Sequence, residues 1–431
     1  MVTRLDVRGL SAASLVDALP RPDAGGATPA VIASARDILA QVRARGDDAV
    51  RDLTERFDGV RLDELAVAPT EWKRALDAIP SAVRDGLEAA AGNVRAFQEA
   101  EAAPDVRWER DGLVVRTLRR PVDRAGCYVP GGRAAYPSTV LHTAVPARVA
   151  GVGEVVVCVP PDRDGRVPDV VLAAAAVAEV DAMYRIGGAQ AIGALAYGTA
   201  SVPAVDVIVG PGNVYVAVAK REVAGEGRVG VPSSFAGPSE IVVVADDTAV
   251  PAHVAIDVIL QAEHGPDGLA WLITWSDAVA DAVAAAIDEL TAAAPRRAEI
   301  ESTLAANGRL VLVDGPEQAM AVSNLIGPEH LELQVAEPEP LVELVRHAGA
   351  VFLGPLAPAS LGDYAAGPSH VLPTHGSARF GGALTVDDFT KPVHVVEVDR
   401  RGFDALAPHV IALAEAEGLS AHADSIKLRQ P

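Results

Sequence analysis

The chain has 431 residues, which is enough for about three domains of ordinary size and for a large hydrophobic core. Half of its residues are hydrophobic and only 4% are aromatic, a composition typical of a soluble α/β enzyme and not of a disordered or fibrous protein. The formal net charge of −21 argues against a nucleic acid or an anionic membrane surface as the partner.

The sequence has only two cysteines, Cys127 and Cys158, which excludes a disulfide framework and a cysteine-rich zinc module. The N-terminus lacks the basic start and apolar run of a signal peptide, and no apolar run reaches the length of a membrane span, about 18 residues. We therefore expect a cytoplasmic protein without a membrane-spanning segment.

Residues 1–25 contain a short amphipathic stretch and a Pro/Gly-rich break, and they form an arm that is too small to fold alone. From residue 30 to about residue 101, apolar residues recur at helical spacing. Residues 106–119 then have the pattern of a β-hairpin around Asp111-Gly112, a dipeptide typical of the type I′ turn.

Apolar strands alternate with helices from residue 123 to about residue 353, which indicates parallel sheets covered on both faces. Strands are expected at 125–129, 154–159, 182–186, 205–209, 240–245, 269–274, 309–313 and 350–353. The predicted fold class is α/β, with two doubly wound, incomplete Rossmann-like parallel sheets and ligands at the carboxyl ends of the strands. Residues 385–431 have the pattern of a small appendage with a strand and a helix.

The segment from Gln261 to Asp267 carries half of a candidate metal site. An apolar helical pattern precedes it, and Gly265-Pro266 ends that helix after His264. Gln261 and His264 are three residues apart and share one face of the last turn, where an amide oxygen and an imidazole suit a divalent cation. The alternative is a buried histidine bonded to a carbonyl group, with the glutamine as a polar filler.

Glu329 and His330 follow a Gly-Pro turn and begin an alternating apolar stretch, which places them at a loop-to-strand junction. A carboxylate beside an imidazole gives two proton-transfer groups with different protonation tendencies. The alternative is an exposed glutamate and a structural histidine.

Asp363 and His370 lie in the Gly- and Pro-rich stretch 361–370, where Asp363 offers a hard oxygen ligand. A helix cap and a surface loop would explain the same residues equally well. Near the C-terminus, Ser420 can cap a short helix that contains His422, although a histidine in a tail is ordinarily solvated.

No Gly-x-Gly-x-x-Gly fingerprint follows an expected strand. The turns at 186–190 and 209–213 are better candidates for a nucleotide, because each leaves a strand and opens a helix whose free N–H groups can bind an anion. These turns contain Gln190 and Asn213, and the ring of Tyr128 at the end of an earlier strand could stack on a bound ring. Such turns occur in any α/β protein and are only moderately specific.

Taken together, these segments resemble the histidinol dehydrogenase family, the zinc enzymes of the last steps of histidine biosynthesis. The resemblance covers nearly the whole chain and rests on six motifs in the family's order: Tyr128–Gly132, Gly187–Tyr197, Gly210–Asn213, Gln261–Asp267, Gly327–Leu331 and Gly362–Pro373. One departure is His142, at a position where we expect an apolar residue such as Met, and we interpret it as a local variation and not as an extra ligand.

The resemblance implies the roles of individual residues. Zinc would be bound by Gln261, His264, Asp363 and His422, and proton transfer would fall to Glu329 and His330. The substrate would be held by the zinc ligands and His330 together with Ser239, His370 and Glu417. The NAD site would be lined by Tyr128, Gln190 and Asn213.

The resemblance also implies the reaction, in which L-histidinol is oxidised to L-histidine through L-histidinaldehyde with two NAD⁺ and one zinc ion per subunit. The family forms homodimers, so Glu417 and His422 are expected to enter the site of the partner subunit. The expected domains are an arm (1–25), a catalytic α/β domain (26–125 and 237–384), an NAD-binding domain (126–236) and a dimerisation segment (385–431).

Two other functions are compatible with the same residues. A zinc hydrolase without a dinucleotide needs the same metal and carboxylate to activate water, and a non-catalytic protein could close two lobes on a small ligand. Cys127 could in principle form a thiohemiacetal with an aldehyde. We favour a small buried thiol at a strand end, because apolar surroundings suppress the thiolate.

Overall fold

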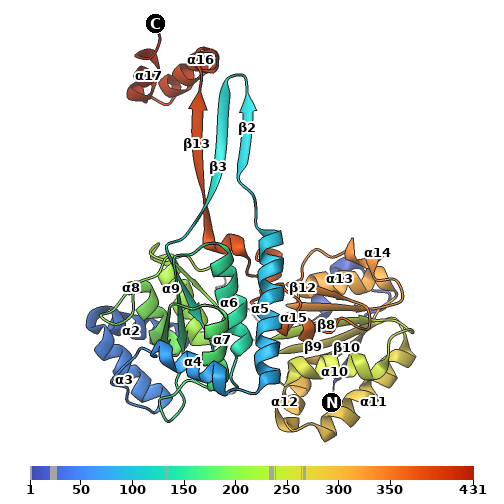
Figure 1. The fold of residues 1–431 in the computed structure, drawn as a ribbon. Helices are drawn as coiled ribbons and strands as arrows, with labels where there is room; N and C mark the ends of the chain where they lie inside the picture. The colour runs from blue at the N-terminus through green and yellow to red at the C-terminus, as the bar shows by residue number, and fades with distance from the viewer. Residues whose placement is uncertain are drawn as a thin grey trace.

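The computed structural model describes residues 2–19, 27–132, 134–232, 237, 239–263, 265 and 268–431. These residues form two parallel β-sheets covered by helices and a third, antiparallel sheet that extends away from the other two (Figure 1). The predicted α/β class with two doubly wound parallel sheets is confirmed.

The four-stranded sheet has the order β6-β5-β4-β7, and all its strands are parallel. The chain runs from β4 (Arg124–Tyr128) to β5 (Glu154–Val159) and β6 (Ala182–Arg185), and then returns to the other side of β4 as β7 (Val207–Val209). The strand order therefore reverses between β4 and β7, which is where open α/β sheets bind ligands. The connecting helices are α6 (Pro137–Val149), α7 (Asp169–Val177), α8 (Gly188–Tyr197) and α9 (Val214–Gly225).

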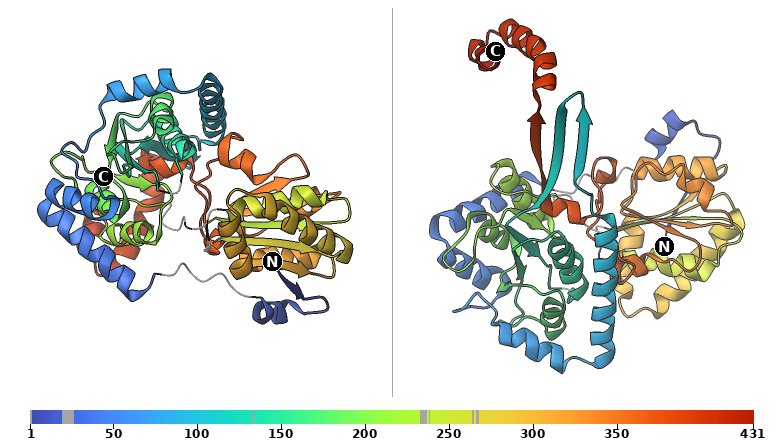
Figure 2. Two further views of the ribbon diagram at one scale, coloured as in Figure 1. Left: turned by 90° about the horizontal axis from the view of Figure 1, so that it is seen from below. Right: turned by 45° about the horizontal axis from the view of Figure 1, so that its top comes forward.

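Four helices from the N-terminal part of the chain pack around this sheet (Figure 2). Ile38 of α2 shares a buried core with Ile208 of β7, and Trp72 of α4 shares another with Val157 of β5. The sequence grouped these helices with residues 237–384, but their packing partners lie on the four-stranded sheet, because helical periodicity gives the buried face and not its partner. They are α2 (Pro29–Arg45), α3 (Asp47–Asp58), α4 (Pro69–Ala78) and α5 (Ser81–Glu101).

The six-stranded sheet has the order β1-β10-β9-β8-β11-β12 and is parallel throughout. Alternate residues of β8 face opposite layers, so that Ile241 packs in the core under α10 and Val242 in the core under α13. Its main strands are β8 (Glu240–Ala245), β9 (Leu269–Thr274), β10 (Gly308–Leu312), β11 (His330–Gln334) and β12 (Ala350–Leu353). Its helices are α10 (Pro251–Ala262), α11 (Asp277–Ala293), α12 (Arg297–Asn307), α13 (Pro316–Ile326), α14 (Glu339–Val342) and α15 (Ala359–Tyr364).

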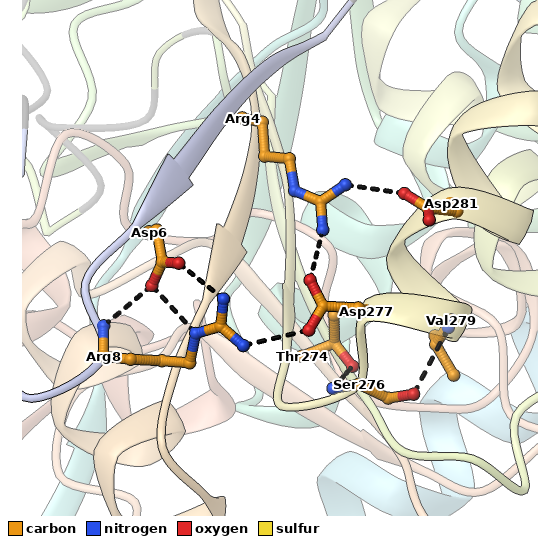
Figure 3. Close-up of polar contacts among 8 residues, drawn as sticks. All are labelled: Arg4, Asp6, Arg8, Thr274, Ser276, Asp277, Val279 and Asp281. Carbon is orange, nitrogen blue, oxygen red and sulfur yellow. Dashed lines mark hydrogen bonds and ion pairs between the residues drawn. The ribbon is translucent and has the colours of Figure 1, made fainter.

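The N-terminal arm completes this sheet, since β1 (Thr3–Asp6) pairs with β10 and α1 (Ala12–Ala18) follows it. Figure 3 shows Arg4 between Asp277 and Asp281, at 2.6 Å from each, and Arg8 at 2.9 Å from Asp277. Each of these side chains is at least 39% exposed, so the ion pairs orient the arm but contribute little free energy.

The antiparallel sheet has the order β13-β3-β2 and carries the C-terminal helices. Its strands are β2 (Val106–Arg110), β3 (Leu113–Pro121) and β13 (Thr390–Val398), followed by α16 (Arg400–Ala416) and α17 (Ser420–Lys427). The predicted hairpin turn is confirmed, because Asp111 and Gly112 have φ of 48° and 83°, as a type I′ turn requires. Both helices lie at the far end of the sheet (Figures 1 and 2), where Val396, Leu413 and Leu428 are 65%, 66% and 84% exposed.

No helix in the described part of the chain combines the length and the apolar composition needed to cross a membrane. Cys127 and Cys158 are both reduced and buried.

Candidate functional site

The residues expected to transfer protons lie where two neighbouring strands begin. Gly327, with a φ of 63°, ends α13, and the chain then passes through Glu329 into β11, whose first residue is His330. β11 pairs with β8, whose first residue is Glu240, and Ser239 directly precedes it. The site is therefore built at the amino ends of the six-stranded sheet, whereas the sequence led us to expect ligands at carboxyl ends.

The backbone of Glu240 holds both proton-transfer residues. Its N–H donates to Oε2 of Glu329 at 2.9 Å, and its carbonyl oxygen accepts a hydrogen bond from Nδ1 of His330 at 3.0 Å. In its neutral form the imidazole carries its proton on Nδ1, so Nε2 is the nitrogen that gains or loses the second proton. Nε2 faces Oδ1 of Asp363 at 3.2 Å.

His330 is 3% exposed and lies among acidic groups. Burial by itself lowers the pKa of His330, but the charges of Glu329 and Asp363 outweigh it and hold that pKa well above its ordinary value. Burial, with the nearby charge of Glu329, raises the pKa of the Glu240 side chain to about 8. This side chain also accepts a hydrogen bond from the N–H of His375 at 2.9 Å and so ties a later loop to β8.

Gln261 reaches the same place from the last turn of α10. Its Nε2 lies 3.4 Å from Nδ1 of His330, and its Oε1 is buried with no hydrogen-bond partner among the described residues. A buried amide oxygen without a partner is unfavourable unless something binds it, and the carboxyl end of a helix favours a positive charge. Gln261 and Asp363 therefore fit a cation-binding site.

The remaining expected metal ligands are not brought to this place within the described chain. His264 lies outside the described residues, which contain no group of three or more His, Cys, Asp or Glu arranged to hold a metal ion. Glu417 and His422 are exposed. Glu417 directly follows α16 and His422 lies in α17, and Figure 1 shows both helices at the far end of the antiparallel sheet, away from both parallel sheets.

His370 is fixed by a stack with His142. The two rings lie 4.4 Å apart at an interplanar angle of 14°, and Nδ1 of His142 accepts a hydrogen bond from the N–H of His370 at 3.3 Å. The other nitrogen of His142 faces the carbonyl oxygen of Tyr364, and burial lowers the pKa of His142 to about 3. His142, the departure noted in the sequence, is thus a neutral support for His370.

The ring nitrogens of His370 have defined roles as well. Nδ1 lies 2.8 Å from the carbonyl oxygen of Asp363 and donates to it, so Nε2 accepts a hydrogen bond from the hydroxyl of Thr139 at 3.2 Å. His370 thereby links α15, which carries Asp363, to helix α6, which packs on the four-stranded sheet.

The residues expected at the dinucleotide site lie at the carboxyl ends of the four-stranded sheet. Tyr128 ends β4, and its phenol oxygen accepts a hydrogen bond from the N–H of Gly188 at 3.1 Å. Tyr128 is 3% exposed, so its ring is buried and does not offer an open face for stacking. Gln190 is 1% exposed, and its Oε1 has no hydrogen-bond partner among the described residues.

The turn after β7 is tightly constrained. Gly210 has a φ of 105°, and a Cβ atom there would lie 2.0 Å from the carbonyl oxygen of Tyr128, so only glycine fits. Nζ of the buried Lys220 donates to the carbonyl oxygen of Gly210 at 2.7 Å. Asn213 is exposed and caps α9, since its Oδ1 accepts hydrogen bonds from the N–H groups of residues 215 and 216.

Three further residues of these sites, Glu240, Lys220 and Thr139, were not predicted from the sequence. Glu240 opens an apolar strand and Lys220 interrupts an apolar helix, and a buried charge in such a position requires a partner. That signal could have found these two residues. Thr139 resembles any small residue in a buried helix, and the sequence holds no signal for it.

Cys127 is completely buried in β4. Burial raises the pKa of its thiol to about 12, so the thiol is protonated at neutral pH and is a poor nucleophile. This environment agrees with a structural thiol.

Comparison with known proteins gives the family. A family model described as histidinol dehydrogenase matches residues 24–430. The histidinol dehydrogenase of Parasynechococcus marenigrum is 50% identical over 393 residues, covering 91% of this chain and 89% of that protein. That of Methanosarcina barkeri is 44% identical over 395 residues, covering 91% and 90%.

A solved structure gives the same result. The crystal structure of histidinol dehydrogenase from Elizabethkingia anophelis matches with a TM-score of 0.93 and 31% sequence identity, covering 99% of this chain and 98% of that one. The match includes both parallel sheets and the antiparallel sheet, since it extends over nearly the whole chain. The chain belongs to the histidinol dehydrogenase family and is an NAD-dependent oxidoreductase.

Proposed function

We propose that this chain is a zinc-dependent enzyme of the cytoplasm that oxidises L-histidinol to L-histidine through L-histidinaldehyde and reduces two NAD⁺, as the final steps of histidine biosynthesis. The observation that carries the proposal is the cluster at the amino ends of β8 and β11. There His330 lies 3.2 Å from Asp363 and 3.5 Å from Glu329. The cluster combines an imidazole and a carboxylate for proton transfer, His330 and Glu329, with side-chain oxygens of Gln261 and Asp363 that can bind a cation.

Zinc would be held by Gln261, His264 and Asp363 of one chain and by His422 of the partner subunit. Two observations support this set: Oε1 of Gln261 is buried without a partner in the described part of the chain, and Asp363 directs a carboxylate oxygen to the same cluster. When bound, a zinc ion with nitrogen and oxygen ligands supplies an anchor for the imidazole and amino nitrogens of the substrate.

Other residues would complete the substrate site. Ser239 lies at the same edge of β8 as Glu240, and His370 is bonded to the backbone of Asp363. Glu417 of the partner subunit would approach with His422 of the partner subunit, because both lie at the junction of α16 and α17.

His330 takes the alcohol proton at Nε2 as a hydride passes from the substrate carbon to NAD⁺, which gives the aldehyde and NADH. Nδ1 remains bonded to the carbonyl oxygen of Glu240, so the ring keeps its orientation during the transfer. Glu329 then takes a proton from water as the water oxygen bonds to the aldehyde carbon, and protonated His330 returns its proton to the aldehyde oxygen, which gives the hydrate and a neutral His330. His330 takes a proton from the resulting hydrate as a second hydride passes to a second NAD⁺, which gives the carboxylic acid and a second NADH.

NAD⁺ would bind at the carboxyl ends of the four-stranded sheet, within residues 126–236, beside Tyr128, Gln190 and Asn213. Helices α8 and α9 begin at this edge, and the partial positive charge at the beginning of each helix suits a pyrophosphate. The buried amide oxygen of Gln190, unpartnered among the described residues, suits a donor on the cofactor.

The test of the reaction is its stoichiometry. We expect two NADH for each L-histidinol consumed, measured by absorbance, and loss of turnover with retained folding when a chelator removes the metal. Hydrolysis without NAD⁺, or ligand binding without turnover, would support one of the two other functions compatible with the sequence. One NADH per histidinol with accumulated aldehyde would remove the second oxidation from the proposal.

Two chains would form the working unit, with the antiparallel sheet and α16 and α17 reaching across to the partner. The exposed apolar side chains Val396, Leu413 and Leu428 support a buried contact in the assembly. The test is subunit complementation, in which the inactive variants His330→Ala and His422→Ala are unfolded and refolded together.

If His422 acts in the partner's site, each mixed dimer contains one intact site, and random mixing should restore about a quarter of wild-type activity. If His422 acts in its own chain, every site in the mixture lacks one residue. Activity no higher than that of the separate variants would therefore overturn the dimer proposal.

A further inference from the structure

A second polar cluster lies directly behind the proposed metal site. It consists of Asp257 on α10 and of Glu332 and Gln334 on β11, which are 4%, 1% and 3% exposed. None of these residues is used by the reaction proposed above. Two acidic side chains buried together are unfavourable unless their contacts are complete, so the cluster calls for a physical account.

The contacts of Glu332 are complete. Its Oε1 accepts a hydrogen bond from the N–H of Ala359, the first residue of α15, at 2.8 Å. Its Oε2 accepts one from Nε2 of Gln334 at 3.1 Å, and the same nitrogen donates to Oδ2 of Asp257 at 3.0 Å. The carboxyl groups of Asp257 and Glu332 therefore share the amide nitrogen of Gln334.

The protonation of the pair agrees with these contacts. Burial and the charge of Glu332 raise the pKa of Asp257 to about 8, and burial raises the pKa of Glu332. Near neutral pH the pair therefore holds a proton.

This cluster repeats the arrangement of the site itself. In the site, Gln261 of α10, His330 of β11 and Asp363 of α15 meet, with distances of 3.4 Å and 3.2 Å to His330. In the deeper cluster, the contacts come from the same three elements. Asp257 lies one helical turn before Gln261 on α10, and Ala359 lies one helical turn before Asp363 on α15. Glu332 lies two residues after His330 on β11.

The spacing explains why the two levels are coupled. Residues four apart share a helix face, and residues two apart share a strand face, so the offsets of four, two and four residues keep both levels on the same sides of the same elements. A shift of α10 or α15 along β11 that broke the hydrogen bonds of Asp257 or Glu332 would also separate Gln261 or Asp363 from His330.

We propose that Asp257 and Glu332 are positioning residues that fix α10, β11 and α15 in the one relative arrangement that brings Gln261, His330 and Asp363 together. The inference rests on the proposed function, because the positioned residues are those assigned to zinc and to proton transfer. Asp257 and Glu332 themselves touch neither substrate nor cofactor.

The test compares three variants of the full-length protein. Asp257→Leu removes the carboxylate oxygen that accepts the hydrogen bond from Nε2 of Gln334, whereas Asp257→Asn keeps an acceptor oxygen for Gln334. Val254→Ala on the same helix is the matched control, because it loses a buried contact in the core without touching the cluster. The measurements are the thermal midpoint, the zinc dissociation constant from competition with a chromophoric chelator, and amide exchange of residues 355–365.

We expect Asp257→Leu to weaken zinc binding on the order of 10–100-fold, the usual effect of losing an outer partner of a metal site. It should also speed amide exchange in residues 355–365. Asp257→Asn should remain close to wild type in both, and Val254→Ala should lower only the thermal midpoint.

Equal zinc binding and exchange in Asp257→Leu and Val254→Ala would overturn the positioning role and leave Asp257 a purely structural residue. A wild-type protein that bound no zinc and oxidised no histidinol would instead overturn the proposed function, so the two failures are distinguishable.

Discussion

The two parallel sheets present opposite ends to their sites. In the four-stranded sheet the residues of interest follow the strands, since Tyr128 ends β4 and Gly210 comes directly after β7. In the six-stranded sheet they precede the strands, since Glu240 and His330 open β8 and β11, and Gln261 ends the helix that leads to β9. Helices therefore begin at the site of the four-stranded sheet, whereas a helix ends at the site of the six-stranded sheet.

This difference sorts ligands by charge. The beginning of a helix carries partial positive charge and unpaired N–H groups, which suit the phosphates of a dinucleotide. The end of a helix carries partial negative charge, which suits a cation beside Gln261. An enzyme that uses an anionic cofactor and a metal can obtain both environments from one kind of sheet by using opposite ends of two copies.

The largest effect is expected at the amino ends of the six-stranded sheet. His330→Ala should lower kcat on the order of 10²–10⁴-fold, the usual contribution of a general base, while the zinc content and NAD⁺ affinity stay at wild-type values. Metal analysis and steady-state kinetics provide the check. Loss of zinc in proportion to activity would place His330 among the metal ligands and contradict its assigned role.

At the carboxyl ends of the four-stranded sheet, Gly210→Ala should impair NAD⁺ binding without affecting zinc binding. The added Cβ atom would lie 2.0 Å from the carbonyl oxygen of Tyr128 and would force the turn to move. We expect NAD⁺ affinity to fall by about tenfold or more, as strain of 1–3 kcal/mol implies, with zinc binding unchanged. Gly225→Ala in α9 is the control, because a Cβ there meets nothing within 4 Å. Equal NAD⁺ affinities in the two variants would argue against a cofactor site at this turn.

The dependence of stability on pH should differ between wild type and Asp257→Asn. The pKa of Asp257 is about 8 in the folded protein and 3.8 ordinarily, so between these values the folded state holds a proton that the unfolded chain has lost. The free energy of unfolding of wild type should therefore fall as pH rises through this window, by up to about 1.4 kcal/mol per pH unit.

Asp257→Asn lacks this titration, and its stability relative to wild type should rise from pH 5.5 to pH 8.5. Urea unfolding followed by tryptophan fluorescence measures the difference at each pH. A difference that stays constant over this range would show that Asp257 keeps an ordinary pKa.

The smallest effect is expected in the middle of the four-stranded sheet. Cys127→Ser should retain activity, because the thiol is completely buried in β4 and is protonated at neutral pH. Steady-state turnover with L-histidinol is the measurement. Near-complete loss of turnover with normal folding would make Cys127 a nucleophile.

The parallel strands were predictable because runs such as residues 155–159 and 241–245 are continuously apolar. β1 was not, because a strand of four largely exposed residues has no core-facing pattern of its own and depends on β10, about 300 residues away. The partners of the N-terminal helices were also beyond the sequence, since periodicity identifies a buried face without naming what covers it.

The candidate site was predictable as motifs but not as geometry. Gln261, Glu329, His330 and Asp363 were each identified locally, and the structure brings these four together because β8 and β11 are neighbours in a strand order that no local pattern encodes. Glu240 was missed although its charge opens an apolar strand, because it holds Glu329 and His330 through its backbone and not through its side chain. The expected ligand position at the carboxyl ends was wrong for this sheet, because its site residues come from the connections that enter the strands.

β1 has one further consequence, which concerns the handling of the protein. It covers the outer edge of β10, and it is short and carries Arg4 and Asp6, features that discourage a strand edge from pairing with other molecules. A construction that removed these first residues, or fused a bulky tag against them, would leave the hydrogen-bonding groups of β10 open to a neighbouring molecule. Self-association through that edge would then reduce the yield of usable enzyme, although every residue of both sites would be intact.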